Sequence, residues 1–358
     1  MTHKSLFFNK AIDYLITNKD GLYIDCTLGL GGHSKQILNR LSINGLLIAL
    51  DNDLNTKTLV KNLEFYLDKR FSFININFKY LEIIAKKKHL FGIVSGILLD
   101  LGISTYQIKD YKRGFSFFIN GPLDMRINNT FGITACCLLN HYKFKQIFKI
   151  FKTYGEDEQL YRLTVEICNR RHHFPFKMTL ELSNLIKTLK FTNYHIKHQL
   201  IKTKPKIQKT YIIHHKSIKI KQKFIKHSKS INTKHIRIKE NTTKNKIIKT
   251  NTNNNNNSNS INKKKKKHIH PSTKIFQAIR SYINNEIQNL EIVIITSLKL
   301  LKTNKKLIII TFNSLESQIV NKVLKTTLNK VNKIYPSIEE VFYNNSSRCS
   351  AIFIIQKL

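Results

Sequence analysis

Three glycines lie at positions where a chain could bind a nucleoside. Gly29, Gly31 and Gly32 follow an apolar segment that begins at Tyr23, and a helical pattern starts near Lys35. Glycine lacks a Cβ atom, so it takes positive φ readily and lets a ligand approach the main chain. A strand, a glycine turn and a helix N-terminus together present free backbone N–H groups to a ligand. Taken alone, an ordinary turn between a strand and a helix explains these glycines equally well.

An aspartate further along the chain favours the ligand-binding interpretation. The apolar segment 46–50 ends at Asp51, which lies 20 residues beyond Gly31. An acid at the end of the second strand of such a unit is placed to accept both hydroxyls of a ribose. The turn, Gly-Leu-Gly-Gly-His-Ser, lacks the third glycine of the dinucleotide fingerprint. A nucleoside without a pyrophosphate, such as S-adenosylmethionine (SAM), therefore fits as well or better, and an NAD-dependent oxidoreductase is the weaker alternative.

A second aspartate, Asp100, ends the apolar segment 96–99. A carboxylate at this strand tip points into the same crevice as Gly31 and Asp51. There it could hold an amino group by its hydrogens and aim the nitrogen lone pair at a methyl group on sulfur. Such positioning for in-line attack can lower a barrier by roughly 7–11 kcal/mol. A helix N-cap for the following segment is the alternative role.

Two loops after Asp100 combine aromatic, basic and glycine residues. They are Arg113–Phe117 and Gly121–Arg126, the second of which contains Gly-Pro and Asp124. Loops that follow a catalytic strand often carry function. Phe115 and Phe117 could stack on a base, and the arginines could contact phosphates. A packed Ω-like loop is the structural alternative.

Strands and helices alternate four times in the first hundred residues, which predicts a doubly wound parallel sheet. The expected strands are 23–26, 46–50, 71–76 and 96–99, and the expected helices are 3–15, 35–41, 55–66 and 80–88.

The chain as a whole divides into three parts. We expect residues 1–104 and 269–358 to form one ligand-binding α/β domain, residues 105–194 to be a helical substrate-recognition insertion, and residues 195–268 to be a disordered Lys/Asn-rich insert. The expected helices of the insertion are 131–141, 144–153, 158–171 and 179–189. Beyond the insert, we expect helices at 272–302 and 314–328, and strands at 307–312, 340–342 and 351–355.

The net charge of +39 indicates a polyanionic partner. Residues 195–270 hold 22 Lys and Arg against one acid, so they carry +21 and the rest of the chain carries +18. The remainder alone is still strongly basic, so nucleic acid is the leading partner.

The five cysteines form no C-x-x-C pair, which indicates a reducing compartment and no structural zinc. The sequence has no 18-residue apolar run and no recognisable signal peptide, and we expect no membrane partner and no metal.

Seven motifs together resemble the RsmH/MraW family of SAM-dependent methyltransferases, which methylate N4 of a cytosine in small-subunit ribosomal RNA. The matching segments are Tyr23–Ser34, Gly96–Ser104, Arg113–Phe117, Gly121–Arg126, Lys152–Glu156, Thr273–Arg280 and Phe312–Glu316. The resemblance implies an α/β, class I methyltransferase fold. It also implies contacts to SAM by Gly31, Gly32, His33, Asp51, Phe78, Asp100 and Gln107. The expected partner is small-subunit rRNA or the assembled small ribosomal subunit, with a homodimer as one option. The expected compartment is the cytoplasm for a bacterial or endosymbiont protein, and a mitochondrion or plastid for a nuclear gene product.

From the motifs and the loop chemistry we expect Asp100 to orient the cytosine amino group as the catalytic residue. We expect the base and its strand to be held by Arg113, Phe115, Asp124 and Arg126. The chain departs from the family pattern at Tyr106, which replaces a proline, at Asn313, which replaces a histidine, and at Ser317, which replaces an aspartate. The segment 346–350 also keeps only one arginine of an expected Pro-Arg-x-Arg-Ser sequence. Asn313 and the missing arginine motivate one alternative function, a catalytically impaired ribosome-assembly factor with the same fold.

Overall fold

The computed structural model describes residues 7–154, 159–189, 270–337, 341 and 349–358. Within these residues, seven strands form one sheet in the order β3-β2-β1-β4-β5-β7-β6. The strands are β1 (Leu22–Asp25), β2 (Leu46–Asp51), β3 (Phe71–Asn75), β4 (Val94–Asp100), β5 (Leu301–Thr311), β6 (Asn329–Ile334) and β7 (Ala351–Lys357). β7 runs antiparallel to both neighbours, and the other pairings are parallel. The mostly parallel α/β sheet expected from the sequence is confirmed.

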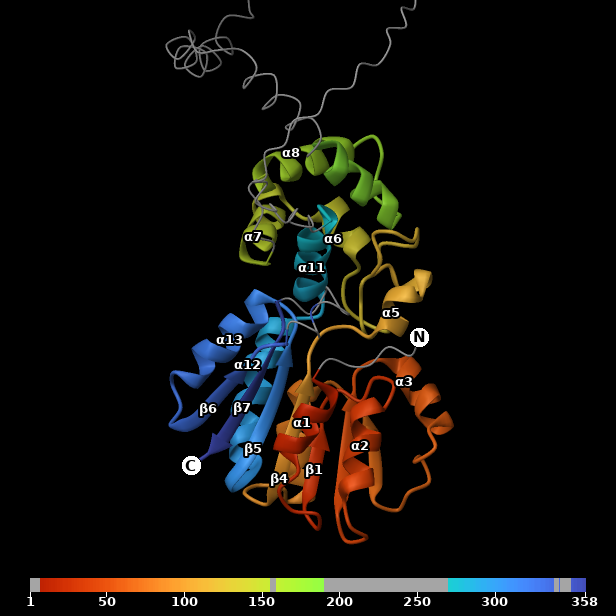
Figure 1. Ribbon diagram of the computed structural model, residues 1–358. Coiled ribbons are helices and arrows are strands. Elements are labelled where there is room, and N and C mark those ends of the chain that lie inside the picture. Colours follow the sequence, from red (N-terminus) through yellow and green to blue (C-terminus); the bar gives the residue numbers. More distant parts are fainter. Residues whose placement is uncertain (1–6, 155–158, 190–269, 338–340, 342–348) are drawn as a thin grey trace, which may run out of the picture. The chain divides into compact units, whose positions relative to one another are not determined.

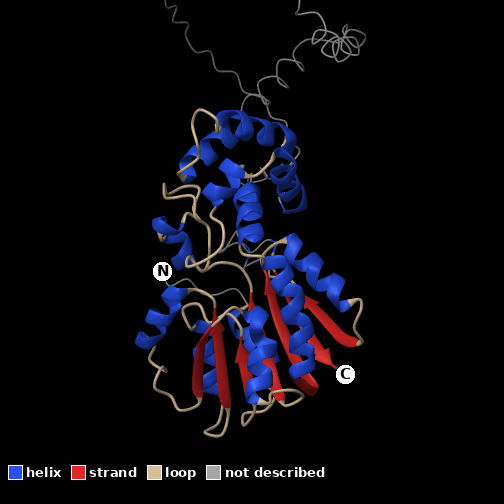
Figure 2. Ribbon diagram, turned by 180° about the vertical axis from the view of Figure 1, so that it is seen from behind, coloured by secondary structure: helices blue, strands red, loops and turns tan. Residues whose placement is uncertain are grey.

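Helices pack on both faces of the sheet (Figures 1 and 2). Because successive side chains of a strand point to opposite faces, Ile97 and Leu99 of β4 join one core cluster and Leu98 joins another. The first cluster contains residues of α4 (Leu81–Lys88), α12 (Glu286–Leu300) and α13 (Ser314–Leu324). The second contains residues of α1 (Phe8–Leu15) and α2 (Gly32–Arg40). Burial on both faces explains why three consecutive apolar residues, 97–99, form the centre of β4.

The pairing of β4 with β5 brings together distant parts of the sequence. Leu98 of β4 lies opposite Ile308 of β5, and Asp25 of β1 lies opposite Leu98 on the other side. β4 is therefore flanked by strands from the two ends of the chain. Its carboxyl end, at Asp100, meets the ends of β1 and β2 at one edge of the sheet.

A third core cluster lies among helices above that edge (Figure 1). It contains residues of α6 (Ala135–His141), α7 (Phe144–Tyr154), α8 (Leu160–Arg170), the helix at residues 179–189 and α11 (Ser272–Ile283). α11 comes after the long insert, yet Ile275, Phe276 and Ile279 are buried among the helices that precede the insert. The division into domains at 104, 194 and 268 remains a prediction.

Several expected elements have different bounds. The helix expected over 55–66 is α3 (Leu54–Leu59) followed by a 3₁₀ turn (Val60–Asn62), because the chain turns there so that Leu63 and Phe65 can pack over Gly31. A short helix, α5 (Thr105–Lys109), and 3₁₀ turns at Phe78–Tyr80 and Tyr111–Arg113 were not expected. Residues 301 and 302 begin β5 and do not end a helix.

The closing strands were only partly predicted. The prediction of a strand over 340–342 is wrong at Val341, which is helical, and its other two residues lie outside the described part. β7 pairs with β5 on one side and with β6 on the other. β6 was not expected because its sequence is polar. The insert 195–268 also lies outside the described residues, so the expectation of disorder stays a prediction. No helix in the described part is long and apolar enough to cross a membrane.

Candidate functional site

A cavity of about 580 Å³ lies at the carboxyl ends of β1, β2 and β4. One wall comes from the sheet and includes Gly29, Asp51, Phe78 and Asp100. The facing wall comes from the loops after β4, from α11 and from the start of α13, and includes Phe115, Met125, Ile127, Phe276, Arg280 and Glu316. Pockets of a few hundred Å³ with a few converging polar groups are typical of small-molecule sites.

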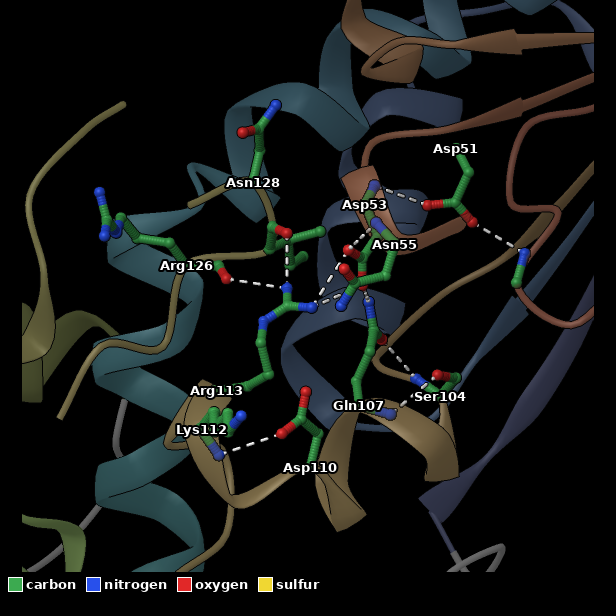
Figure 3. Close-up of polar contacts among 12 residues, drawn as sticks. Asp51, Asp53, Asn55, Ser104, Gln107, Asp110, Lys112, Arg113, Arg126 and Asn128 are labelled. Atoms are coloured by element: carbon green, nitrogen blue, oxygen red, sulfur yellow. Dashed lines mark hydrogen bonds and ion pairs between the residues drawn. The ribbon is translucent and has the colours of Figure 1, made fainter. Parts of the chain in front are cut away.

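Asp51 is held by the glycine turn and by its own strand end. The N–H of Gly29 donates to Oδ2 of Asp51 (2.8 Å), and the N–H of Asp53 donates to Oδ1 (2.8 Å; Figure 3). Burial raises the pKa of Asp51 to about 6, although these two hydrogen bonds act in the opposite direction. The carboxylate is thus fixed in one orientation at the cavity wall, with lone pairs left for a diol.

The glycines shape the turn in different ways. Gly29 (φ +53°) lines the cavity, whereas Gly31 and Gly32 do not. Gly31 (φ +79°) precedes the first residue of α2, and a Cβ atom there would lie 2.8 Å from Leu63 and 2.9 Å from Phe65. Gly31 therefore lets the turn fit beneath these two side chains. The expected contacts of Gly31 and Gly32 with the cofactor remain predictions.

Asp100 lines the cavity at the tip of β4. Its N–H donates to Oγ1 of Thr27 (2.8 Å), and one of its oxygens, Oδ2, lies 3.4 Å from Nδ1 of His33. The other oxygen, Oδ1, has no hydrogen-bond partner among the described residues. Burial raises the pKa of Asp100 to about 8, and the charges of Asp25 and Glu316 add to the shift. Oδ1 is itself buried, whereas the Asp100 side chain as a whole is 26% exposed and lines the cavity, so the carboxyl group is suited to contact a ligand.

His33 is buried beside Asp100 and does not line the cavity. Its Nε2 atom has no partner within the described part, and its ring lies 5.1 Å from that of Phe8, centre to centre. Burial lowers the pKa of His33, so the ring is neutral at neutral pH. The contact of His33 with SAM that the resemblance implies remains a prediction, and its contact with Asp100 was not foreseen.

Phe78 and Gln107, which were assigned only from the resemblance, both line the cavity. Gln107 lies on α5, where Ser104 and Gln107 form a reciprocal N-cap: the N–H of Ser104 donates to Oε1 of Gln107 (2.8 Å) and the N–H of Gln107 to Oγ of Ser104 (3.2 Å). The side-chain amide nitrogen of Gln107, Nε2, donates to Oδ2 of Asp53 (2.7 Å). Gln107 therefore braces the cavity wall in addition to facing it.

The expected substrate-binding residues separate into two groups. Phe115 lines the cavity and is buried. Arg113, Asp124 and Arg126 do not line it. The guanidinium of Arg113 is bound to Asp53, and Arg126 forms an ion pair with Asp124 (Nη2–Oδ2 2.7 Å). In this structure the three polar residues hold the protein together, and their contacts with a substrate remain predictions.

Sequence reasoning missed several polar residues of the site. The Asp53 residue is 3% exposed and forms the centre of a hydrogen-bond network. The pattern Asp-Asn-Asp at the end of β2 is present in the sequence, but no role was assigned to its second aspartate. Arg280, Asn313 and Glu316 line the cavity, and they lie in two motifs that carried the resemblance without being assigned a role. Burial raises the pKa of Glu316 to about 7. No group of metal-ligating side chains occurs in the described ranges.

Comparison with known proteins finds similar chains over the whole length of the sequence. A model of the MraW methylase family matches residues 1–205 and 209–358. A protein of Legionella pneumophila (strain Paris) named ribosomal RNA small subunit methyltransferase H is 30% identical over 99% of each chain. A protein of Buchnera aphidicola with the same name is 30% identical over 99% of this chain and 97% of its own. A solved structure described as a putative rRNA-methylase from Clostridium thermocellum aligns over 100% of both chains at 10% identity, with a TM-score of 0.41.

Proposed function

Because this chain belongs to the MraW methylase family, we propose that it methylates N4 of a cytidine in small-subunit ribosomal RNA, using SAM. The enzyme class and the cofactor follow from the family. The observation that supports methylation of a cytidine is the convergence of Asp51 and Asp100 on one cavity, which is also lined by aromatic side chains such as Phe115 and Phe276. The names of the relatives support small-subunit rRNA as the substrate.

The cavity residues fit the chemistry of SAM. Asp51, already oriented by two backbone N–H groups, would accept the ribose hydroxyls. Phe78 would lie against the adenine, and the main chain at Gly29 leaves room for the ligand. Of the carboxyl groups that line the cavity, Asp51 has a pKa of about 6 and is therefore mostly ionised at neutral pH, which suits a cofactor that carries a positive charge on sulfur. Bound there, SAM supplies an electrophilic methyl group.

Asp100 would act on the nucleophile. Its carboxylate would accept an N–H of the cytosine amine and so turn the nitrogen lone pair toward the methyl group. As the new N–C bond forms, the bond between the methyl group and sulfur would break and S-adenosylhomocysteine would leave. The amine would lose one proton, which the ionised Asp100 carboxylate can take up. Phe115 and Phe276 on the facing wall would hold a base that has been turned out of its stack.

Asn313, where the family usually has histidine, does not favour the impaired alternative. Oδ1 of Asn313 accepts the N–H of Glu316 (2.9 Å), which makes Asn313 the N-cap of α13. Asparagine is among the best N-cap residues. This departure therefore supports the local structure of the cavity wall.

The experiment is mass mapping of methylated cytosines in small-subunit RNA after reaction with SAM. Naked rRNA and assembled small subunits are tested in parallel, because the partner is small-subunit rRNA in either form. We expect one N4-methylcytidine that disappears with Asp100→Ala. Bound SAM without any methylated base would instead support the assembly-factor alternative. Calorimetry with SAM and NAD tests the cofactor separately.

The two named relatives are bacterial, which supports a cytoplasmic location.

A further inference from the structure

A buried network around Asp53 connects the two walls of the cavity (Figure 3). Asp53 follows β2, and its N–H holds Oδ1 of Asp51 (2.8 Å). The Asp53 carboxylate is bound from the other side by Nη1 of Arg113, at 3.1 Å to Oδ1 and 2.9 Å to Oδ2. The side chains of Asp53 and Arg113 are only 4% and 7% exposed. Asp51, the last residue of β2, thus lies on the cofactor wall, and Asp53, two residues later, forms this ion pair.

The same guanidinium reaches the facing wall. Its Nη2 donates to the carbonyl oxygens of Arg126 (3.1 Å) and Ile127 (2.6 Å). Met125 and Ile127 line the cavity where we propose that the target base lies. Asn284, between α11 and α12, binds the same segment: it donates to the carbonyl of Met125 (2.8 Å) and accepts the N–H of Ile127 (2.7 Å).

We propose that Arg113 is a positioning residue that transmits cofactor binding at Asp51 to the wall segment 125–127. This inference rests on the proposed function only in that the cofactor binds at Asp51. A ligand that holds the Asp51 carboxylate also fixes the tip of β2, and therefore the Asp53 carboxylate next to it. Fixing the Asp53 carboxylate in turn fixes the segment 125–127, because the planar guanidinium of Arg113 binds this carboxylate through one nitrogen and two carbonyl oxygens through another. The base-facing wall is then formed before RNA arrives.

The geometry requires arginine and not merely a positive charge. A lysine at position 113 keeps the charge, but its single ammonium cannot span the Asp53 carboxylate and both carbonyl oxygens in one plane. Asp53→Asn removes the charge from the other partner while keeping its shape and its N-cap acceptor for the N–H of Asn55. The two variants therefore break the same connection by different means.

Hydrogen exchange measured by mass spectrometry tests the proposal without RNA. The probe is S-adenosylhomocysteine, the product form of the cofactor. In the wild-type chain it should slow exchange in two peptides: 27–33, which contains the N–H of Gly29, and 122–128, which contains those of Met125 and Ile127. We expect slowing of about tenfold or more in the remote peptide, which lies within the usual range of coupling between sites.

The variants separate positioning from simple stability. In Arg113→Lys and Asp53→Asn, peptide 27–33 should still be protected by the probe at saturation, and the added protection of 122–128 should disappear. Lys112→Gln is the matched control, because it removes a charge from an exposed side chain next to Arg113 and should keep both effects. A merely structural role for Arg113 would speed exchange in 122–128 equally with and without the probe.

Two different failures can be told apart. If the probe protects neither peptide in the wild-type chain, the cofactor does not bind at Asp51 and the proposed function fails. If it protects 27–33 and leaves 122–128 unchanged, the site stands and the positioning role of Arg113 is wrong. If Arg113→Lys does not fold, as judged by circular dichroism, Asp53→Asn supplies the same comparison.

Discussion

Nδ1 of His33 lies 3.4 Å from Oδ2 of Asp100, and the two side chains are 6% and 26% exposed. Burial lowers the pKa of His33 and raises that of Asp100 to about 8. Asp25 and Glu316 also act on Asp100, and both of these carboxylates raise its pKa. At neutral pH the free enzyme therefore has a largely protonated Asp100 next to a neutral histidine.

This arrangement predicts a pH profile for methyl transfer. A protonated Asp100 cannot accept the proton of the amine, so kcat/KM should rise with pH up to about 8 and then level off. His33→Phe removes a nitrogen that can stabilise the carboxylate, so the midpoint should move to higher pH. The measurement is initial rates at subsaturating RNA between pH 6 and 9.5. A profile that is flat over that range would show that Asp100 does not act as the proton acceptor.

Replacing Asp100 should affect chemistry more than cofactor binding. Asp100→Asn keeps the shape and loses the proton acceptor, and general-base contributions of this kind are about 10²–10⁴-fold in rate. Single-turnover rates should fall by that factor while the calorimetric Kd for SAM changes much less. Asp20→Asn, on an exposed turn, is the control for loss of a carboxylate. An equal loss of affinity and rate would make Asp100 a cofactor-binding residue only.

Asp51 should control affinity for the cofactor and its dependence on pH. In Asp51→Asn the side-chain NH2 replaces one carboxylate oxygen and therefore faces the N–H of either Gly29 or Asp53. The variant also loses the charged acceptor for the ribose hydroxyls, which costs about 1.5–3 kcal/mol of binding free energy. The Kd for SAM should therefore rise by about one to two orders of magnitude. The wild-type affinity should also fall as pH decreases through about 6, because Asp51 then becomes protonated. Calorimetry from pH 5 to 8 measures both effects.

Gly31 and Gly92 form a matched pair for testing the turn. Both have positive φ (+79° and +71°), so an alanine at either position bears a backbone cost of about 1–2 kcal/mol. Only at Gly31 would the new Cβ atom also meet Leu63 and Phe65, since nothing lies within 4 Å at Gly92. In urea denaturation, Gly31→Ala should destabilise the chain more than Gly92→Ala. Equal losses would mean that the two side chains move aside freely.

The parts of the site that lie at strand ends could be predicted from the sequence. Asp51 and Asp100 each end an apolar run, and the carboxyl ends of neighbouring parallel strands share an edge of the sheet. This physical rule needs no knowledge of the loops. The same reasoning located Phe115 after the fourth strand, where connections cover the crevice.

The Asp53–Arg113 pair could not be predicted in the same way. Sixty residues separate the partners, and their contact depends on how the loop after α5 folds back over β2. Arg113 therefore looked like a free cation suited to phosphate. The polar strand β6 was missed for a different reason. Among the strands that the structure describes it pairs only with β7, so its sequence needs no continuous apolar run.

The pairing of Leu98 with Ile308 has a consequence for synthesis of the chain. The first four strands leave the ribosome long before β5 exists, a delay of roughly 10–40 s at about 5–20 residues per second. During that interval the apolar strand β4 is an uncovered sheet edge, which is the kind of surface that templates aggregation. A nascent chain of this protein should therefore be a strong client for chaperones until its last hundred residues are made.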